Sequence, residues 1–254
     1  MSTDYSHSIR NRLFLVLGSD ELEYSITNNA LEKLLAGKTA VTDSAMLEQV
    51  LSTVSPINEI FSSVSLTWVG SHFLCYPSMF TNTSDQKKLY LTSYTLRPTD
   101  KLLNGSLNAD ISVAYAIDNT LLTVLKKRFP NLVYRHEIES LFKYVQSDVK
   151  PTGNYVVIDR NESHCLIIVK DADGIRLMNQ YDIKELNDVF YFVMLAIEQL
   201  DLDIEVLSLY WIDGAKLDRF EDIKSLFENY IKHIIEVELP EGISSAMTTS
   251  IACG

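Results

Sequence analysis

The chain has 254 residues and a formal net charge of −12, from 34 Asp and Glu against 22 Lys and Arg. This length is sufficient for one large core or two modest ones, which excludes a small domain stapled by disulfides. A chain this acidic is repelled by phosphate backbones, and we therefore expect no nucleic-acid partner.

Glycine is scarce, with 9 residues in the whole chain. An enzyme that cradles phosphate needs glycine where its backbone closely approaches the ligand. The composition therefore disfavours a nucleotide-dependent enzyme before any motif is considered.

No segment is predicted to direct secretion or to cross a membrane. The first ten residues are polar, and the longest apolar run, residues 189–197, is much shorter than the ~20 residues of a membrane span. Cys75, Cys165 and Cys253 are an odd number of widely spaced cysteines, which is typical of reduced thiols. We therefore expect a cytoplasmic protein.

The first half of the chain begins with a predicted hairpin. Residues 13–17 are apolar, Gly18 and Ser19 form a turn, and residues 22–26 alternate between apolar and polar. Residues 80–109 are a mixed insertion, rich in Ser, Thr, Asn and Tyr, for which no element order is predicted. The remaining predicted elements are helices at 43–54, 118–129 and 138–145, and strands at 65–69, 73–76, 111–117 and 132–134.

Residues 150–153, with Pro151 and Gly153, predict a boundary, after which a similar order of elements begins. Residues 244–254 are small and polar, and we expect a weakly ordered tail there. The elements predicted between these segments are strands at 155–158, 165–169, 175–179, 204–212 and 234–239, and helices at 184–200 and 218–231.

In both halves, antiparallel strands come first and strands joined through helices follow. That order predicts a mixed sheet with helices on its faces in each half, and hence an α/β molecule with two lobes. The expected lobes are residues 1–149, with the insertion near 80–109, and residues 150–254, with the tail.

This order of elements resembles the actin-like ATPase superfamily, a ribonuclease H-like fold that includes sugar kinases, Hsp70-type chaperones and actin. Within it, the arrangement looks most like the bacterial pilus-assembly and cell-division actin relatives. The resemblance covers roughly residues 12–240. It implies a two-lobed fold and three loops that would contact ATP and magnesium.

The first such loop is an Asp-x-Gly turn between the first two strands, in which the Asp organises metal and water. Gly18 and Ser19 match the turn, but Val16 stands where the resemblance places the Asp. A valine side chain can neither hold Mg²⁺ nor orient a water molecule.

The other two loops lie in the second lobe. Asp159 keeps the acid of the second Asp-x-Gly turn, and Asn161 replaces its glycine. Gly214 keeps one glycine of the adenosine-binding pair, whereas Asp213 brings a negative charge towards the phosphates. At ~4 Å and an effective dielectric constant of ~20, such a like-charge contact costs about 4 kcal/mol. Asp159 can alternatively be a turn residue that bonds its own backbone.

The altered loops predict a non-catalytic actin-like protein that serves as a scaffold or regulatory partner of another protein, with no cofactor. The alternative is an ATPase that binds ATP with magnesium through Gly18, Ser19, Asp159, Asn161, Asp213 and Gly214. A third possibility is a small-molecule binding protein, and a homo-oligomer is compatible with either leading hypothesis.

Two further patterns have simple structural interpretations. His72 with Cys75, and His164 with Cys165, each resemble half of a zinc site, but they lie in predicted strands of different lobes, so we expect no metal. Glu236 and Glu238 alternate on the closing strand, which predicts a solvated face.

Overall fold

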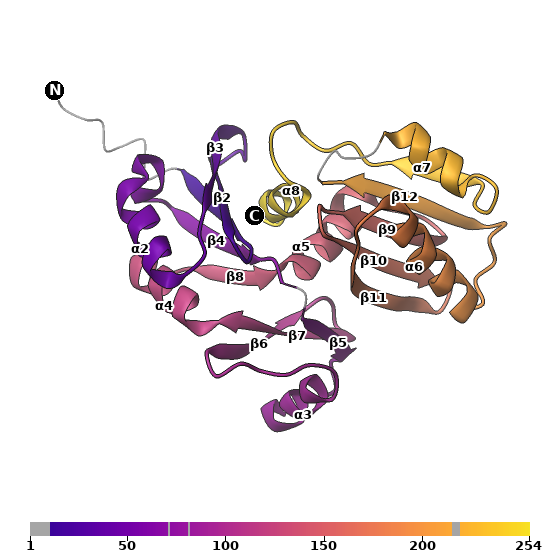
Figure 1. Ribbon diagram of the computed structural model, residues 1–254, viewed down its shortest axis with the longest axis horizontal. Coiled ribbons are helices and arrows are strands. Elements are labelled where there is room, and N and C mark those ends of the chain that lie inside the picture. Colours follow the sequence, from indigo (N-terminus) through magenta and orange to yellow (C-terminus); the bar gives the residue numbers. More distant parts are fainter. Residues whose placement is uncertain (1–10, 71, 81, 215–218) are drawn as a thin grey trace. The chain divides into compact units, whose positions relative to one another are not determined.

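The computed structural model describes residues 11–70, 72–80, 82–214 and 219–254 (Figure 1). Within these ranges the chain divides into two compact units: unit 1 extends to Lys143 and includes Thr249–Gly254, and unit 2 is Tyr144–Thr248. This division falls at the end of helix α5 (Glu137–Tyr144), and the expected boundary lies between residues 149 and 150. Pro151 and Gly153, which suggested the boundary, lie in the loop that leads into the next strand.

The main sheet of unit 1 has five strands in the order β3-β2-β1-β4-β8. The first three strands pair antiparallel, whereas β4 runs parallel to both β1 and β8. β1 is buried along almost its whole length, as expected of a central strand covered on both faces. The strands are β1 Arg12–Leu17, β2 Glu21–Thr27, β3 Lys33–Ala40, β4 Ser63–Trp68 and β8 Val133–His136.

Helices α2 (Ser44–Thr53) and α4 (Asn119–Arg128) lie side by side in unit 1 (Figure 1). Each begins at an aspartate whose side chain accepts a hydrogen bond from a backbone N–H of the first turn: Asp43 for α2 and Asp118 for α4. Their buried faces are aliphatic, and α4 ends just before Pro130 as predicted. A short 3-10 helix, η1 (Ser55–Asn58), follows α2.

A smaller three-stranded sheet with order β5-β7-β6 completes unit 1. It consists of β5 (Phe73–Pro77), β6 (Asp100–Ser106) and β7 (Ile111–Asp118). Helix α3 (Thr83–Ser93) contacts β5 and β7. Residues 80–109, for which the sequence predicted no order of elements, thus contain helix α3 and strand β6. Tyr76, Tyr90 and Ala114 form a small separate core here.

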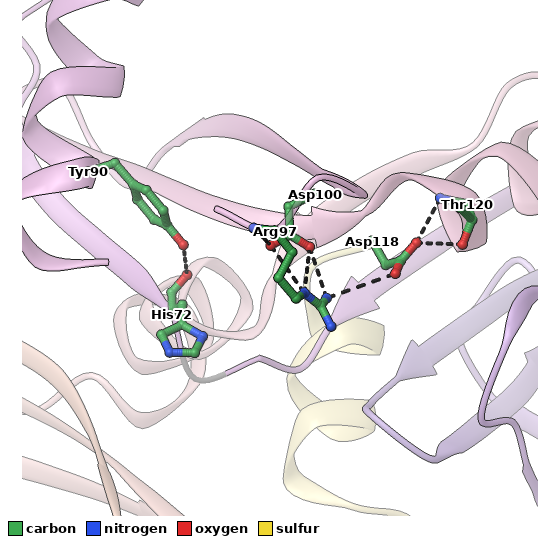
Figure 2. Close-up of polar contacts among 6 residues, drawn as sticks. All are labelled: His72, Tyr90, Arg97, Asp100, Asp118 and Thr120. Atoms are coloured by element: carbon green, nitrogen blue, oxygen red, sulfur yellow. Dashed lines mark hydrogen bonds and ion pairs between the residues drawn. The ribbon is translucent and has the colours of Figure 1, made fainter. Parts of the chain in front are cut away.

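Charged side chains hold the start of β6 against the end of β7 (Figure 2). Asp100 and Asp118 stand opposite each other in the strand register. The Arg97 guanidinium donates two hydrogen bonds to Oδ1 of Asp100, at 2.9 and 3.0 Å, and lies 3.9 Å from Oδ2 of Asp118. Arg97 therefore offsets the repulsion between the two facing carboxylates. In the same view, the Tyr90 hydroxyl donates to the carbonyl oxygen of His72 at 3.1 Å.

Unit 2 repeats the mixed sheet with the order β11-β10-β9-β12-β13. A meander of three antiparallel strands is again followed by two parallel pairings. The strands are β9 Asn154–Arg160, β10 His164–Asp171, β11 Gly174–Asp182, β12 Leu207–Asp213 and β13 His233–Glu236. The two main sheets thus share one topology, and the predicted α/β class with a mixed sheet in each lobe is confirmed.

Helices α6 (Leu186–Gln199) and α7 (Phe220–Phe227) pack their apolar residues on one face of the unit 2 sheet. Val193 of α6, Phe227 of α7 and Trp211 of β12 are members of this core. The segment that joins α5 to β9 forms a single π-helical turn, η2 (Val145–Val149).

The C-terminal segment is a helix, α8 (Ser245–Ala252), and the expectation of a weakly ordered tail is wrong. The residues are small and polar, but their side chains are buried from Ser245 to Ser250. Backbone and hydroxyl groups bond within the helix, where Ser244 Oγ accepts from the N–H of Met247 at 3.1 Å and Thr248 Oγ1 donates to the Ser244 carbonyl at 3.0 Å. Burial with satisfied polar groups therefore orders the segment.

Across the described ranges, no helix is both long and apolar enough to cross a membrane.

Candidate functional site

The turn between β1 and β2 contains Gly18 and Ser19, the two predicted site residues of unit 1. The Gly18 N–H donates to the carbonyl oxygen of Glu21 at 2.9 Å, and the exposed Ser19 hydroxyl donates to Asp20 Oδ1 at 3.2 Å. A Cβ placed on Gly18 would meet only the Glu21 oxygen, at 3.8 Å. The turn therefore has a hairpin geometry that does not require glycine at position 18.

Val16 occupies the place of the missing acid and lies in the sheet core, with 6% of its surface exposed. It stands in register with Glu23 of β2 on one side and with Thr67 of β4 on the other. The buried Glu23 carboxylate lies 3.9 Å from the ammonium group of Lys38 on β3. An acid is thus present one strand away from Val16, but it faces a cation of its own sheet.

Thr67 connects this row of residues to the end of α8. Its hydroxyl donates to Ser250 Oγ at 2.9 Å and lies 3.4 Å from Ser140 Oγ of α5. All three side chains are buried. The sheet face that carries Val16 is therefore covered within unit 1 by hydroxyl-bearing side chains.

In unit 2, Asp159 lies near the end of β9 with 1% of its surface exposed. Its neighbours in register are Leu166 of β10 and Ile212 of β12. Burial, followed by the nearby carboxylates of Asp148 and Asp159, raises the pKa of the Tyr144 phenol above its usual range. Asp159 is therefore a strand residue inside the sheet rather than an exposed residue of the turn.

Asn161 follows in the β9–β10 turn, and both its backbone and its side chain are bonded. Its N–H donates to the carbonyl oxygen of His164 at 2.9 Å, and its own carbonyl oxygen accepts a short hydrogen bond from the Arg160 guanidinium. Its side-chain oxygen accepts from the hydroxyl of Ser245 at 3.3 Å. The side chain thus lies between the turn and the start of α8.

Gly214 follows β12, and Ser245 packs against it. A Cβ on Gly214 would stand 2.3 Å from Ser245 Oγ and 3.1 Å from Asn161 Oδ1, so only glycine fits. The Gly214 N–H donates to the carbonyl oxygen of Arg160 at 3.0 Å. The two second-lobe loops therefore meet one another and Ser245, and the Gly214 amide is used within the fold.

Asp213 pairs in register with Arg160, so an acidic and a basic residue occupy facing positions on β12 and β9. The structure thus brings together Asn161, Asp213 and Gly214 at one end of the unit 2 sheet, with Asp159 on the strand that leads to them. Gly18 and Ser19 belong to unit 1.

Sequence reasoning missed Ser245 as part of this arrangement. The available signal was the run from 244 to 250, in which every residue except Met247 is small and which lacks Gly and Pro, so that it can form a closely packed helix.

Metal and thiol chemistry have little support among the described residues. These residues contain no group of three or more His, Cys, Asp and Glu side chains that could hold a metal ion. Burial raises the pKa of the Cys75 thiol and that of the Cys165 thiol to about 12 each. Both cysteines therefore remain protonated at neutral pH and are poor nucleophiles.

Known structures with the same arrangement of elements define the fold class. A structure from Bacteroides thetaiotaomicron VPI-5482, described as a protein with actin-like ATPase fold and unknown function, matches with a TM-score of 0.83 and 16% identity over 100% of both chains. The PilM-PilN type IV pilus biogenesis complex matches with a TM-score of 0.60 and 10% identity over 91% of this chain and 89% of that chain. The fold is therefore that of the actin-like ATPases, as the sequence resemblance implied.

The cytoplasmic domain of EpsL, an inner membrane component of the type II secretion system of Vibrio cholerae, matches with a TM-score of 0.50 and 10% identity over 96% of this chain and 94% of that chain. The family model described as "Protein of unknown function (DUF3822)" matches residues 2–234, and the chain belongs to this family. No curated protein matches the chain.

Proposed function

We propose that this protein is a non-catalytic member of the actin-like fold that works through contact with a protein partner, as a scaffold or regulatory component. Two relatives by fold are parts of assemblies, PilM in a complex with PilN and EpsL in a secretion system. This chain acts in the same way, as one component of a protein assembly.

The observation that carries the proposal is the packing of Ser245 on Gly214 and Asn161. A phosphate-binding loop needs free backbone N–H groups and open space beside glycine. Here the Gly214 amide is bonded to Arg160, and the Ser245 hydroxyl occupies the space beside its Cα. The loop that would receive the nucleotide is instead part of the packing of unit 2.

Val16 provides independent support, because it is an apolar residue at the position where the fold's metal-organising acid is expected. The neighbours of Val16 in the strand register are Glu23 and Thr67. Glu23 is the acid of this pair, and its carboxylate lies beside the Lys38 ammonium group. The residues present therefore do not fit ATP with magnesium.

The alternative, an ATPase, is favoured by one specific observation. Asp159 is retained and buried at the end of β9, next to the β9–β10 turn. A buried carboxylate near a turn can serve catalysis, but it can also be a structural residue.

Release of inorganic phosphate from Mg-ATP separates the two hypotheses. We expect the wild-type protein to release phosphate no faster than the Asp159→Ala variant. Asp173→Ala, a change of the same kind in the exposed β10–β11 turn, is the matched control. Turnover that Asp159→Ala abolishes and Asp173→Ala preserves would contradict the proposal.

A further inference from the structure

The outer edge of β13 is an open sheet edge. β13 is the last strand of the unit 2 sheet and pairs only with β12 among the described strands. The N–H of Val237 donates to the carbonyl oxygen of Trp211 at 2.8 Å, which continues the parallel ladder. Because backbone groups alternate in direction along a strand, those of Ile234 and Glu236 point away from β12.

From Ile235 to Glu238, side chains along this edge alternate between aliphatic and acidic. Glu236 stands in register with Trp211, on the face of the sheet that α6 and α7 cover, and Ile235 stands in register with Tyr210 on the opposite face. Glu236 and Glu238 are exposed, and 37% of the Ile235 surface is exposed. Within the described part of the chain, neither glutamate forms an ion pair with Lys or Arg.

The net charge of the protein is concentrated in unit 2. Residues 144–248 contain 20 Asp and Glu against 9 Lys and Arg, a net charge of −11, whereas unit 1 accounts for −1. An acidic unit of this size attracts a basic partner over a distance and raises the rate of its association.

We propose that the β13 edge binds an extended segment of a partner protein as an additional strand, and that this segment alternates Lys or Arg with aliphatic residues. Its backbone pairs with the outward groups of Ile234 and Glu236. Its basic side chains lie beside Glu236 and Glu238, and its aliphatic side chains lie beside Ile235. This inference rests on the proposed function, because it assigns the surface through which the protein contacts its partner.

A second copy of this chain is a less suitable occupant of the same edge. Pairing two β13 strands would bring Glu236 and Glu238 of both copies together, and like charges on adjacent strands destabilise a sheet. The charge of the edge therefore favours a basic partner of different sequence.

A synthetic peptide of about eight residues in which Lys alternates with Val tests the proposal with the full-length protein. Affinity is measured by fluorescence anisotropy, and the site is located by backbone hydrogen exchange. We expect the alternating peptide to bind at least tenfold more tightly than a peptide of the same composition with its Lys residues in one block. We also expect amide protection to increase at residues 234–238. Equal affinity for both peptides, or no added protection there, would overturn the proposal.

Variants of Glu236 separate backbone pairing from simple charge attraction. Glu236→Pro removes an outward N–H without breaking the ladder to β12, so it should abolish binding of the alternating peptide. The double variant Glu236→Gln/Glu238→Gln keeps every N–H and should lower the affinity for the alternating peptide at least tenfold. If the proline variant fails to fold, this double variant tests whether the peptide binds at β13. The double variant Glu198→Gln/Glu228→Gln, with the same loss of charge on α6 and after α7, should bind like wild type.

Two controls make the possible failures distinguishable. We expect sedimentation of the protein alone to show no dimer that depends on β13. A dimer that Glu236→Pro disrupts would identify a second copy as the occupant of β13 and overturn the proposal. Peptide binding should be the same with and without Mg-ATP. If the protein binds both Mg-ATP and the peptide, the proposed function is contradicted and the assignment of the β13 edge is not. If the protein binds neither, the assignment of the β13 edge is contradicted and the proposed function is not.

Discussion

The carboxyl group of Glu139 on α5 fills the space beside Gly105 on β6, so that a Cβ added to Gly105 would stand 2.1 Å from Oε2 of Glu139. The other carboxylate oxygen, Oε1, accepts a hydrogen bond from the N–H of His136 at 2.8 Å. The side chain therefore cannot move away without losing this bond. The small sheet therefore packs closely against α5 at Gly105 and Glu139, within unit 1.

We therefore predict that Gly105→Ala lowers the free energy of unfolding by about 1–3 kcal/mol, the usual cost of overpacking. Urea denaturation measures this change. Gly18→Ala is the matched control, because a Cβ there meets no close atom, and its effect should stay within about 0.5 kcal/mol. Introducing Glu139→Ala should make Gly105→Ala less costly, and additive effects of the two changes would contradict this explanation.

The ionisation of Glu139 should make stability depend on pH. Burial raises the pKa of Glu139 above its usual value, although the hydrogen bond from His136 and the charge of Arg135 lower it in part. A raised pKa in the folded state means that this group stabilises the protein at low pH and that the contribution is lost as the pH rises through the folded-state pKa.

Glu139→Gln removes this titration and keeps an oxygen for the His136 N–H. We expect the free energy of unfolding of the variant, relative to wild type, to increase as the pH rises above the range in which an ordinary glutamate ionises. Chemical denaturation across this pH range provides the measurement. A difference that stays constant with pH would show that Glu139 does not carry the effect.

The hydrogen bond from Thr67 to Ser250 should stabilise the end of α8. Thr67→Val preserves the shape of the side chain but leaves the buried Ser250 and Ser140 hydroxyls without their partner, so we expect a loss of about 1–3 kcal/mol. Thr53→Val, at an exposed threonine at the end of α2, should change stability by less than about 0.5 kcal/mol. Limited proteolysis should also cleave the C-terminal segment of the Thr67 variant faster, and equal cleavage rates would argue against this anchor.

The charged cluster of Figure 2 gives a prediction for the small sheet. Arg97→Ala leaves the facing carboxylates of Asp100 and Asp118 without their shared cation, and we expect a loss of about 1 kcal/mol. Lys88→Ala, which removes an exposed ion pair with Asp85, is the matched control and should have a smaller effect. Thermal unfolding of the two variants side by side provides the comparison, and equal shifts would contradict a special role for Arg97.

Asp118 should also contribute to acid sensitivity. Partial burial alone would raise its pKa, but hydrogen bonds from Thr120 and Leu121, together with Arg97, lower the pKa of Asp118 below its usual value. Stability from this group is therefore present at neutral pH and lost as the pH falls through the folded-state pKa. In Arg97→Ala, this loss should begin at higher pH.

The elements predicted correctly are those whose burial leaves a periodic pattern in the sequence. β1 and β2 form the predicted hairpin, and the three strands that open unit 2 form the predicted meander. In these segments, apolar residues recur at the period of the element, so that local pattern and tertiary burial agree.

The elements that were missed lack such a pattern for physical reasons. β3 is an edge strand with mostly exposed side chains, among them Lys38 in a stretch that the sequence left without a strand. α8 consists of small side chains except for Met247 and Ile251, too few apolar residues for a helical period, and it is ordered by contacts such as the one between Ser250 and Thr67, which are distant in sequence. Pairing partners of this kind cannot be identified from composition or periodicity.

At the candidate site, the sequence identified the replaced residues but not their contacts. The substitution of Val16 for an acid and of Asn161 for a glycine could be read directly, given the resemblance of the fold. The packing of Ser245 on Gly214 could not be predicted from the sequence, because residues 31 positions apart in the chain share no local pattern.

Titration of the purified protein with Mg-ATP in an isothermal calorimeter tests the central claim most directly. If the Gly214 and Asn161 loops are packed into the fold and Val16 leaves no acid for the metal, the titration should produce no heat of binding beyond dilution. Saturable binding with a micromolar dissociation constant would contradict the account.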